Sequence, residues 1–586
     1  MPDRISPTAA PTASLQECDL IMKGGITSGV VYPQAVARIA RDYRLRSIGG
    51  SSAGAIAACF AAAAEYRRQS GGGAEMAGFA EISALSTDLA RNLQTLFQPR
   101  PALAPLFQLL IGAIQGAIGR AAWRLWRLPV AAAAALLAAA LLWAAWAGNF
   151  FAATTALLAV PLGLALWTLV PLLRMAARDL PQANFGLCPG ITQPGHDSPA
   201  LTDWMHKRLQ RISGRPGDAP LTAGDLAAHG IQIAAMTTDL SSQRPFQLPL
   251  STRIHYFSLA EWRGLFPADF LEALIAGRAP LAHQQDHAPR DLYQLPVGDD
   301  FPVLLVARMS LSFPGLIESI PLWRHDDQIR LPGPEGRSVG RLARCLFSDG
   351  GISSNFPIHF FDSLLPSRPT FGIALASWDH ARHRDTRVHL PARSPASSNL
   401  PVRPIDGLGG FAMAILNTAK DWQDTLQGML PGYAERVVTV RLDDRVEGGM
   451  NLTMPPEVIE QLNRYGAEAG DSLVARYSYA AGARGFDDHR QLRGRITVPK
   501  LAEALQGFAS AMGSRPAGAP AAPTGREAMG GGGAGAAGPG LSPRCLSLAD
   551  ELAELEPDGC EPDRVSDATI RLVAVADRMP RRRGSA

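Results

Sequence analysis

The amino-acid sequence predicts an α/β domain of three layers that is interrupted by a hydrophobic helical hairpin. Two short apolar runs, residues 19–22 and 45–48, each lead into a glycine-rich turn, as buried strands often do. The second turn is followed by residues 55–66, an alanine-rich stretch without Gly or Pro that predicts a helix. Residues 128–173 contain no charged side chain, and this stretch predicts the hairpin.

Four further apolar runs are expected to add strands to the same sheet. They lie at residues 231–236, 344–347, 370–375 and 437–440. Helical stretches lie between some of them, and alternation of strand and helix is typical of an α/β sheet covered on both faces. The sequence therefore predicts one domain over residues 18–500, with an insertion at residues 102–178.

The composition excludes several classes of protein. Of the 586 residues, 47% are hydrophobic and 19% are charged, which excludes a mainly disordered chain. A net charge of +3 creates no strong field for nucleic acid, so no nucleic-acid partner is expected. The six cysteines form no C-x-x-C pair, and neither a disulfide framework nor a zinc site is expected. The first residues lack an apolar signal core, so no cleaved secretory peptide is expected.

Both ends of the chain are expected to lie outside the packed domain. Residues 1–17 are rich in Pro, Ala and Ser and predict a flexible N-terminus. Residues 511–543 are rich in Gly, Ala and Pro and predict a linker, because they cannot bury enough apolar surface to offset their ordering entropy. Residues 544–586 are interpreted as a solvated C-terminal tail with one short amphipathic helix.

The uncharged stretch is long enough for two transmembrane helices. Gly148 and Asn149 divide it, and residues 130–147 and 150–173 each approach the roughly 20 residues that span a bilayer. Arginines flank both sides, and the positive-inside bias places these flanks, with the domain joined to them, in the cytoplasm. Residues 102–119 predict an interfacial helix or a third membrane segment. The alternatives are a buried hairpin in a soluble core and an oligomerisation hairpin.

Gly50-x-Ser52-x-Gly54, between a strand and a helix, predicts a nucleophilic serine at a sharp turn. Small residues on both sides let the backbone bend and expose the hydroxyl group. The N-terminus of the following helix adds positive potential where negative charge develops. The alternative is a chance match of this short pattern in a chain rich in Gly and Ser.

A second glycine-rich turn, at residues 23–29, predicts hydrogen-bond donors for an oxyanion. Gly24 and Gly25 follow the first strand, and glycine lets backbone N–H groups point into a cavity that side chains would fill. Gly29 closes the turn. The Gly-Lys-Ser/Thr ending of a phosphate-binding loop is missing, which disfavours nucleotide binding and leaves an ordinary glycine turn as the alternative.

Asp349 is the predicted base for the serine. It lies at the end of the strand at residues 344–347, against Gly350 and Gly351, and strand ends are where sites form in α/β sheets. A partly desolvated aspartate is a better base than a solvated one. None of the twelve histidines has a setting that stands out, although a Ser-His-Asp esterase stays an alternative.

In this order, the glycine-rich turn, the Gly50-x-Ser52-x-Gly54 motif and the turn at residues 349–351 resemble the patatin-like phospholipase family. The resemblance spans residues 18–375 and extends toward residue 480. Other segments agree with it, at residues 220–226, 237–240, 307–310, 313–314, 355 and 357. Two positions depart from the family pattern: Ile26 stands where the family has a third glycine, and Ser28 where it has a basic residue.

The resemblance implies a three-layer α/β/α fold and a Ser–Asp dyad without a catalytic histidine. Ser52 would be the nucleophile and Asp349 the general base, and backbone N–H groups of Gly24, Gly25 and Ala53 would hold the oxyanion. An acyl-enzyme would form from a lipid ester, and neither a metal nor another cofactor is required.

The expected function is therefore that of a membrane-associated serine lipid acyl hydrolase of the phospholipase or lipase type. Its expected partners are a lipid ester substrate and the bilayer, with the catalytic domain facing the cytoplasm. The alternatives are a transacylase and a catalytically silent membrane scaffold. The lipid, the acyl position, the oligomeric state and the role of the tail stay open.

Overall fold

The computed structural model describes most of the chain between residues 15 and 513. The described ranges are 15–25, 27–114, 117–215, 217, 219–332, 338–363, 365–392, isolated positions between 402 and 424, 432–443, 446–449, 451–478 and 485–513. Most of the predicted N-terminal segment and linker, and the whole predicted tail at 544–586, lie outside these residues.

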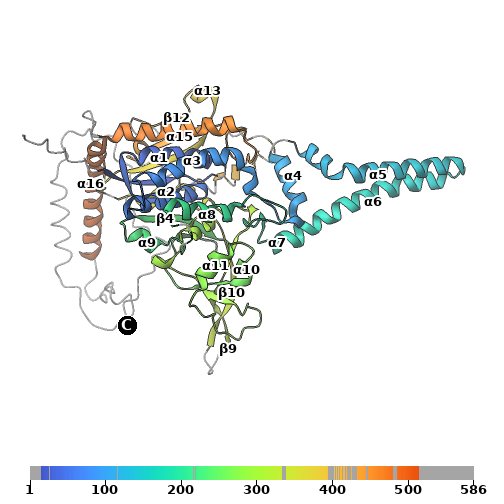
Figure 1. The fold of residues 1–586 in the computed structure, drawn as a ribbon, viewed down its shortest axis with the longest axis horizontal. Coiled ribbons are helices and arrows are strands. Elements are labelled where there is room, and N and C mark those ends of the chain that lie inside the picture. Colours follow the sequence, from blue (N-terminus) through green and yellow to red (C-terminus); the bar gives the residue numbers. More distant parts are fainter. Residues whose placement is uncertain are drawn as a thin grey trace, which may run out of the picture.

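A sheet of eleven strands forms the centre of the described part of the chain (Figure 1). Its parallel half has the order β13-β11-β1-β2-β4, and every neighbouring pair in it is parallel. The bounds of these strands are Val437–Leu442, Thr370–Ser377, Gln16–Met22, Tyr43–Gly50 and Gln232–Asp239. β1 thus begins two residues before the predicted start of the domain.

The other half of the sheet is antiparallel. It continues from β4 in the order β10-β9-β6-β7, while β5 pairs with β4 and β12 lies at the opposite edge beside β13. The bounds are Ser338–Asp349, Ile320–Pro332, His255–Ser258 and Leu292–Gln294, with β5 at Arg244–Leu248 and β12 at Val388–His389. All six predicted runs are strands, and the predicted mixed α/β class is confirmed.

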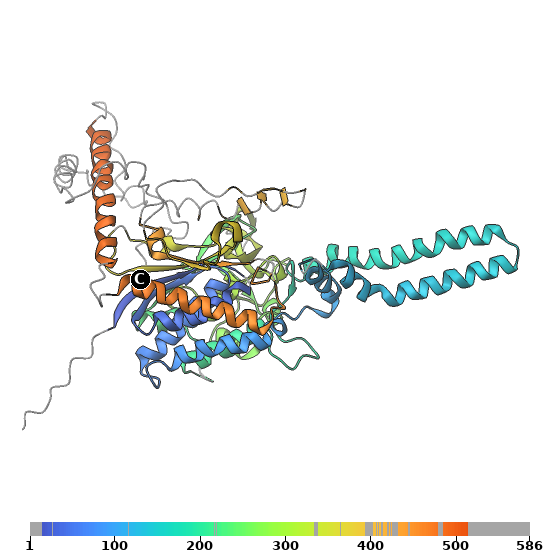
Figure 2. The same ribbon diagram turned by 90° about the horizontal axis from the view of Figure 1, so that it is seen from above.

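Helices cover one face of the sheet (Figure 2). They are α1 (Tyr32–Ile39), α2 (Ala53–Ser70), α3 (Ala77–Asn92), α8 (Leu201–Ser213) and α15 (Pro456–Tyr477). α2 confirms the helix predicted at residues 55–66. Its run of buried alanines has small side chains, so neighbouring helices can pack closely against it.

The opposite face is covered by the segment that follows β10. Phe356 and Ile358 pack there against Ile21 of β1 and Val437 of β13. This segment contains two 3-10 turns, Gly350–Ile352 and Ile358–Phe360. The predicted three-layer arrangement is therefore present, with a layer of long helices on one face only within the described residues. The C-terminal α16 (Gly485–Gly513) stands beside this body (Figure 1) and continues past the predicted domain end at residue 500.

The insertion forms two long antiparallel helices, α5 (Ile118–Trp146) and α6 (Phe150–Arg174), that project from the body (Figures 1 and 2). The turn lies at the predicted place: Gly148 has φ +60°, and the Asn149 side chain accepts a hydrogen bond of 3.0 Å from the N–H of Ala152. α5 begins twelve residues before the predicted helix at 130–147. It therefore carries the flanking arginines of residues 120–127 within its first turns.

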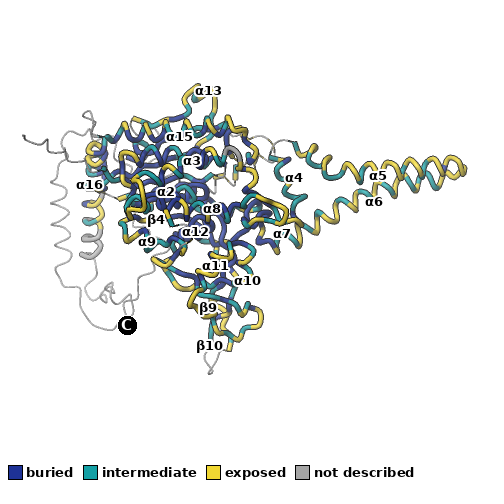
Figure 3. The backbone as a smooth tube through the Cα atoms, in the orientation of Figure 1, coloured by how far each residue is buried: buried dark blue, intermediate teal, exposed yellow. Residues whose placement is uncertain are grey.

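Most of the hairpin surface is exposed or half-buried (Figure 3). In the most apolar window of each helix only 6% and 0% of the residues are buried, and both helices are long and apolar enough to cross a membrane. This exposure argues against a hairpin buried in a soluble core. Before them, the predicted segment at residues 102–119 contains the short apolar helix α4 (Ala104–Ile114), which packs against α5.

Candidate active site

Ser52 lies in a sharp elbow between β2 and α2. Its backbone has φ +53° and ψ −126°, a region that side-chain-bearing residues rarely adopt. The two motif glycines make room for this turn. A Cβ atom on Gly54 would lie 2.2 Å from the carbonyl oxygen of Met22, and one on Gly50 would lie 2.5 Å from the carbonyl carbon of Gly54. Larger residues at either position would push the elbow away from β1.

The side chain and the backbone of Ser52 are both held by hydrogen bonds. Its Oγ donates to the carbonyl oxygen of Gly25 at 3.0 Å, and its N–H donates to Oγ of Ser310 at 3.0 Å. All twelve histidines are among the described residues, and none of them is hydrogen-bonded to Ser52. The site therefore offers no Ser–His pair.

Asp349 is the last residue of β10. Its Oδ1 accepts a hydrogen bond of 2.7 Å from the N–H of Gly351, and its N–H donates to the carbonyl oxygen of Ser312 at 2.9 Å. Its carbonyl oxygen accepts a bond of 3.0 Å from Oγ1 of Thr238 on β4. The residue is 3% exposed, the same fraction as Ser52. The N–H of Gly351 thus orients the carboxylate, while Ser312 and Thr238 hold the backbone of Asp349.

The sheet brings these two turns close together, at neighbouring positions along β4. β2 and β10 lie on either side of β4, where Gly50 is opposite Ala235 and Asp349 is opposite Thr237. With about 4.8 Å between neighbouring strands, the two strand ends lie roughly 10 Å apart. The turns after them come closer, because a Cβ atom on Gly350 would lie 2.8 Å from Oγ of Ser51.

The end of α12 (Val303–Ser310) connects the two turns. Ser310 binds the N–H of Ser52, while the carbonyl oxygen of Ser312 accepts bonds from the N–H of Asp349 and from Oγ of Ser348, at 2.9 and 2.8 Å. Sequence reasoning noted this segment only as part of a family pattern. The structure makes it the common support of the predicted nucleophile and base.

The glycine turn lies beside Ser52, and hydrogen bonds hold two of the predicted oxyanion donors in this conformation. The N–H of Gly24 donates to the carbonyl oxygen of Asn355 at 2.7 Å, and the N–H of Ala53 donates to the carbonyl oxygen of Gly25 at 3.3 Å. Two of the three predicted oxyanion donors are therefore already bonded. In this conformation the Gly25 carbonyl takes the position next to Ser52 that the prediction gave to an oxyanion.

The glycine turn at residues 23–29 is also held by the segment around Gly449. Oγ1 of Thr27 donates to the carbonyl oxygen of Gly449 at 3.2 Å, and the N–H of Thr27 reaches the same oxygen at 3.4 Å. Gly29 packs against Ala53, where an added Cβ atom would lie 2.7 Å from the alanine Cβ. Both ends of the turn are thus in contact with other parts of the site.

An apolar cavity of about 80 Å³ begins beside the elbow. It lies between α2, α3, α8 and the segment after α12. Its lining includes Gly29, Val30, Pro33, Ala53, Ile56, Ala57, Phe60, Leu85, Leu89, Leu93, Leu96, Phe97, Leu201, Trp204, Leu311, Phe313 and Ile317. Sequence reasoning missed this cavity, because its walls come from segments that are far apart along the chain. Ala53 connects it to the predicted nucleophile.

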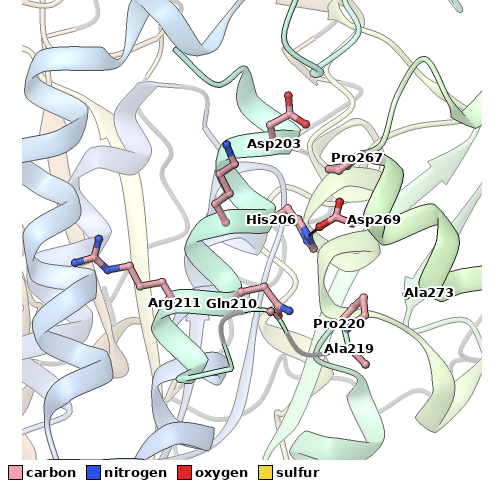
Figure 4. A pocket seen from close by; sticks show the side chains of 11 residues that line it. Asp203, His206, Gln210, Arg211, Ala219, Pro220, Pro267, Asp269 and Ala273 are labelled. Atoms are coloured by element: carbon pink, nitrogen blue, oxygen red, sulfur yellow. Dashed lines mark hydrogen bonds and ion pairs between the residues drawn. The ribbon is translucent and has the colours of Figure 1, made fainter. Parts of the chain in front are cut away.

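A larger pocket of about 540 Å³ lies elsewhere, between α8 and α11 (Ala268–Ile275) (Figure 4). The side chains of His206 and Asp269 point toward each other across it, with Nε2 and Oδ2 3.0 Å apart. Its lining combines charged and polar side chains with Gly, Ala and Pro residues, and no residue of the elbow or of the Asp349 turn lines it. Its size alone does not make it a reactive site, and the smaller apolar cavity lies next to the predicted nucleophile.

The sequence comparisons agree with this geometry. Residues 20–362 match the family described as Patatin-like phospholipase, from β1 through the elbow to the turns after Asp349. A protein of Rhizobium meliloti (strain 1021), named RpoH suppressor, is 35% identical over 578 residues, which cover 84% of this chain and 86% of the relative. The chain therefore belongs to the patatin-like phospholipase family.

Proposed function

We propose that this protein is a membrane-associated serine lipid acyl hydrolase that cleaves fatty-acyl esters. The observation that carries the proposal is the buried elbow at Ser52, which lies across β4 from the Asp349 turn and beside an apolar cavity. Membership of the family supports hydrolysis of lipid acyl esters in general. The assignment of individual residues is our own.

In the proposed mechanism, Asp349 accepts the hydroxyl proton of Ser52 as Oγ attacks the ester carbonyl carbon. The C–O bond to the alcohol then breaks, and the proton passes from Asp349 to the departing oxygen. The acyl group remains on Ser52 as an ester. Asp349 next takes a proton from water, which attacks this acyl-enzyme and releases the fatty acid, and the proton returns to Ser52.

The oxyanion formed at each step needs N–H donors. The Gly25 carbonyl must turn away from Ser52 before the N–H of Ala53 can bind the oxyanion, and the N–H of Gly24 must leave the carbonyl oxygen of Asn355. Glycine permits such a rotation of the backbone, because it lacks the Cβ atom that restricts other residues. We therefore propose that the N–H groups of Gly24, Gly25 and Ala53 serve as donors after this rearrangement, which substrate binding would favour.

The apolar cavity is suited to the acyl chain of the substrate. Its lining is almost entirely aliphatic and aromatic, and each methylene group buried there contributes about 0.8 kcal/mol. Leu93, Leu96 and Phe97 lie at its wall and directly precede the insertion. An acyl chain bound there would lie between the reactive serine and the root of the hairpin.

The hairpin supports attachment to a bilayer. Exposed apolar side chains cover both helices, and α6 alone is about 38 Å long at 1.5 Å per residue. Arginines lie only at the root of the hairpin, so the positive-inside bias would put the catalytic body in the cytoplasm.

Labelling with a fluorophosphonate probe tests the proposal in full-length, detergent-extracted protein. Wild type should be labelled at Ser52, while Ser52→Ala and Asp349→Asn should lose labelling and hydrolysis of a lipid ester at least a hundredfold. Ser51→Ala is the matched control. The Ser51 hydroxyl neighbours Ser52, is also buried and has no hydrogen-bond partner among the described residues. The Ser51→Ala variant should keep both activities.

The histidines distinguish the dyad from a conventional triad. Each single His→Ala variant that folds should keep labelling, because no histidine is bonded to Ser52. One histidine that proved essential for labelling would favour a Ser-His-Asp esterase instead.

A catalytically silent scaffold is the second candidate function. It is favoured by the hydrogen bonds of two proposed oxyanion donors, since the N–H of Ala53 is bonded to the Gly25 carbonyl and the N–H of Gly24 to the Asn355 carbonyl. Folded wild-type protein that no fluorophosphonate labels, in detergent or in vesicles, would establish this reading. A transacylase would be labelled like a hydrolase, and it would transfer the acyl group to an added alcohol faster than to water.

A further inference from the structure

One buried carboxylate fastens both ends of the insertion. The Glu318 side chain is fully buried and accepts hydrogen bonds from Arg100, with Nη2 and Oε2 3.0 Å apart, and from Nδ2 of Asn184 at 3.2 Å. Arg100 directly precedes the first turn of the insertion, Pro101–Leu103, and Asn184 follows its last helix, α7 (Leu180–Gln182). The chain between these two partners contains the whole hairpin.

The backbone around Glu318 strengthens the same connection. The N–H of Arg100 donates to the carbonyl oxygen of Leu187 at 2.9 Å, and the N–H of Ser319 donates to that of Asn184 at 3.2 Å. The short strands β3 (Gly186–Cys188) and β8 (Gly315–Ile317) pair in parallel next to these bonds. The root of the hairpin is thus attached to the segment that follows α12.

Arg308 carries the connection from Glu318 toward the site. Its guanidinium is completely buried and donates to the carbonyl oxygen of Glu318 at 2.9 Å and to Oγ of Ser312 at 2.7 Å. Burial lowers the pKa of Arg308 to about 10, and the Glu318 charge opposes this shift, so the guanidinium stays protonated at neutral pH. The Glu318 charge therefore stabilises the protonated form of Arg308.

The path ends at the two reactive residues. The carbonyl oxygen of Ser312 binds the N–H of Asp349, and Ser310, two residues after Arg308, binds the N–H of Ser52. A catalytic group displaced by about 1 Å can lose roughly a hundredfold in rate. A small movement of Glu318 would thus displace residues 308–312, and with them both proposed catalytic groups.

We propose that Glu318 is a positioning residue that couples the root of the hairpin to the active-site turns. A bilayer that holds α5 and α6 would fix Arg100 and Asn184, and through Glu318 and Arg308 it would fix Ser52 and Asp349. The lipid surface then activates the enzyme in addition to supplying substrate. This inference rests on the proposed function.

The experiment uses the full-length protein and a soluble ester, p-nitrophenyl butyrate, so that access to substrate does not depend on the membrane. Wild type should turn over faster, by about fivefold or more, in phosphatidylglycerol/phosphatidylethanolamine vesicles than in detergent. Arg100→Gln should bind vesicles normally and lose this activation, because it frees one end of the hairpin at a partly exposed position. Glu318→Gln should lower kcat about tenfold with little change in KM.

Glu65→Gln is the matched control. Glu65 is also fully buried and pairs with Arg68, but neither residue touches the path from Glu318 to Ser52. It should keep the vesicle activation and the kcat of the wild type. Where Glu318→Gln does not fold, Arg100→Gln decides.

The outcomes separate this inference from the proposed function. Wild type labelled at Ser52, with Arg100→Gln as strongly activated by vesicles as wild type, would overturn the coupling and leave the hydrolase intact. An equal loss in Glu65→Gln would also overturn it, since the effect would then follow from any buried carboxylate. Wild type that no probe labels would overturn both.

Discussion

At the scale of single residues, the site depends on positions where the backbone leaves no room for a side chain. Gly50 and Gly54 allow Ser52 its positive φ, and Gly350 lets the Asp349 turn approach Ser51. These glycines could be predicted from the sequence, because a short motif contains all the residues that need one another. The same holds for Ser52 and Asp349 as a proposed pair.

Other residues of the site could not be predicted, because their partners are distant in sequence. Glu318 binds Arg100 and Asn184, which precede it by 218 and 134 residues, and no local pattern marks such a triplet. The orientation of the Gly25 carbonyl likewise depends on the elbow that approaches it, and the motif alone predicted donors in its place.

His255 should make the fold sensitive to acid. It is buried against the rings of Phe246 and Phe347, and within the described part of the chain neither of its ring nitrogens has a hydrogen-bond partner. Burial lowers its pKa to about 4, so the unfolded chain, with an ordinary histidine pKa near 6.5, takes up the proton first as the pH falls. The neutral histidine therefore contributes fully to the free energy of unfolding above pH 6.5. As the pH falls from 6.5 to about 4, the free energy of unfolding decreases by roughly 3 kcal/mol.

Thermal unfolding in a non-ionic detergent measures this effect. His255→Phe should unfold at a melting temperature that falls less than that of wild type between pH 6.5 and pH 4. Parallel curves for the two proteins over this range would show that His255 does not titrate on unfolding.

At the scale of elements, the parallel half of the sheet could be predicted and most of the antiparallel half could not. The predicted strands in β1, β2, β4 and β11 are apolar runs, because helices or turns bury both faces of the sheet there. β9 carries five consecutive charged or polar residues and is mostly exposed beyond Trp323. Its pairing with β10 holds it in the sheet, and its own sequence does not reveal it.

The cavity beside α2 should determine which acyl chains are accepted. Ala57 lines it from α2, one helical turn after Ala53. Ala57→Phe would fill space that a long chain needs, so kcat/KM should fall about tenfold for p-nitrophenyl decanoate and within twofold for the butyrate. Ala57→Ser, of nearly the same volume, should change neither. An equal loss for both esters in Ala57→Phe would place the acyl chain elsewhere.

At the scale of the whole molecule, the protein has a compact body and one long apolar projection. The sequence indicated both parts, because a long uncharged stretch is readable without knowledge of tertiary contacts. The predicted start of the first hairpin helix was twelve residues too late, because the arginines near the start of α5 were interpreted as flanks and lie within the helix.

Charges placed in the hairpin should weaken its attachment to membranes. Leu136 and Leu162 lie near the middle of the two apolar stretches and are exposed. Each lysine costs about 2.5–3.5 kcal/mol at the centre of a membrane helix, and the favourable contribution of the leucine is lost as well. Wild type should pellet with membranes and be released only by detergent, while Leu136→Lys/Leu162→Lys should appear in the supernatant.

Leu240→Lys is the control for that measurement, because Leu240 is an exposed leucine on the body. It should remain in the membrane fraction. Wild type found in the supernatant after high-speed spinning without detergent would refute the membrane attachment.

The length of α6 has a consequence for how substrate would reach the enzyme. Its 25 residues exceed the roughly 30 Å hydrocarbon core by about 8 Å, which leaves only enough for its root to cross the headgroup layer. If the hairpin spans a bilayer as proposed, a body tethered so tightly cannot search the surrounding water. Its encounters would occur by lateral diffusion within one leaflet, so that the mole fraction of substrate lipid in that leaflet, and not its bulk concentration, would govern the rate.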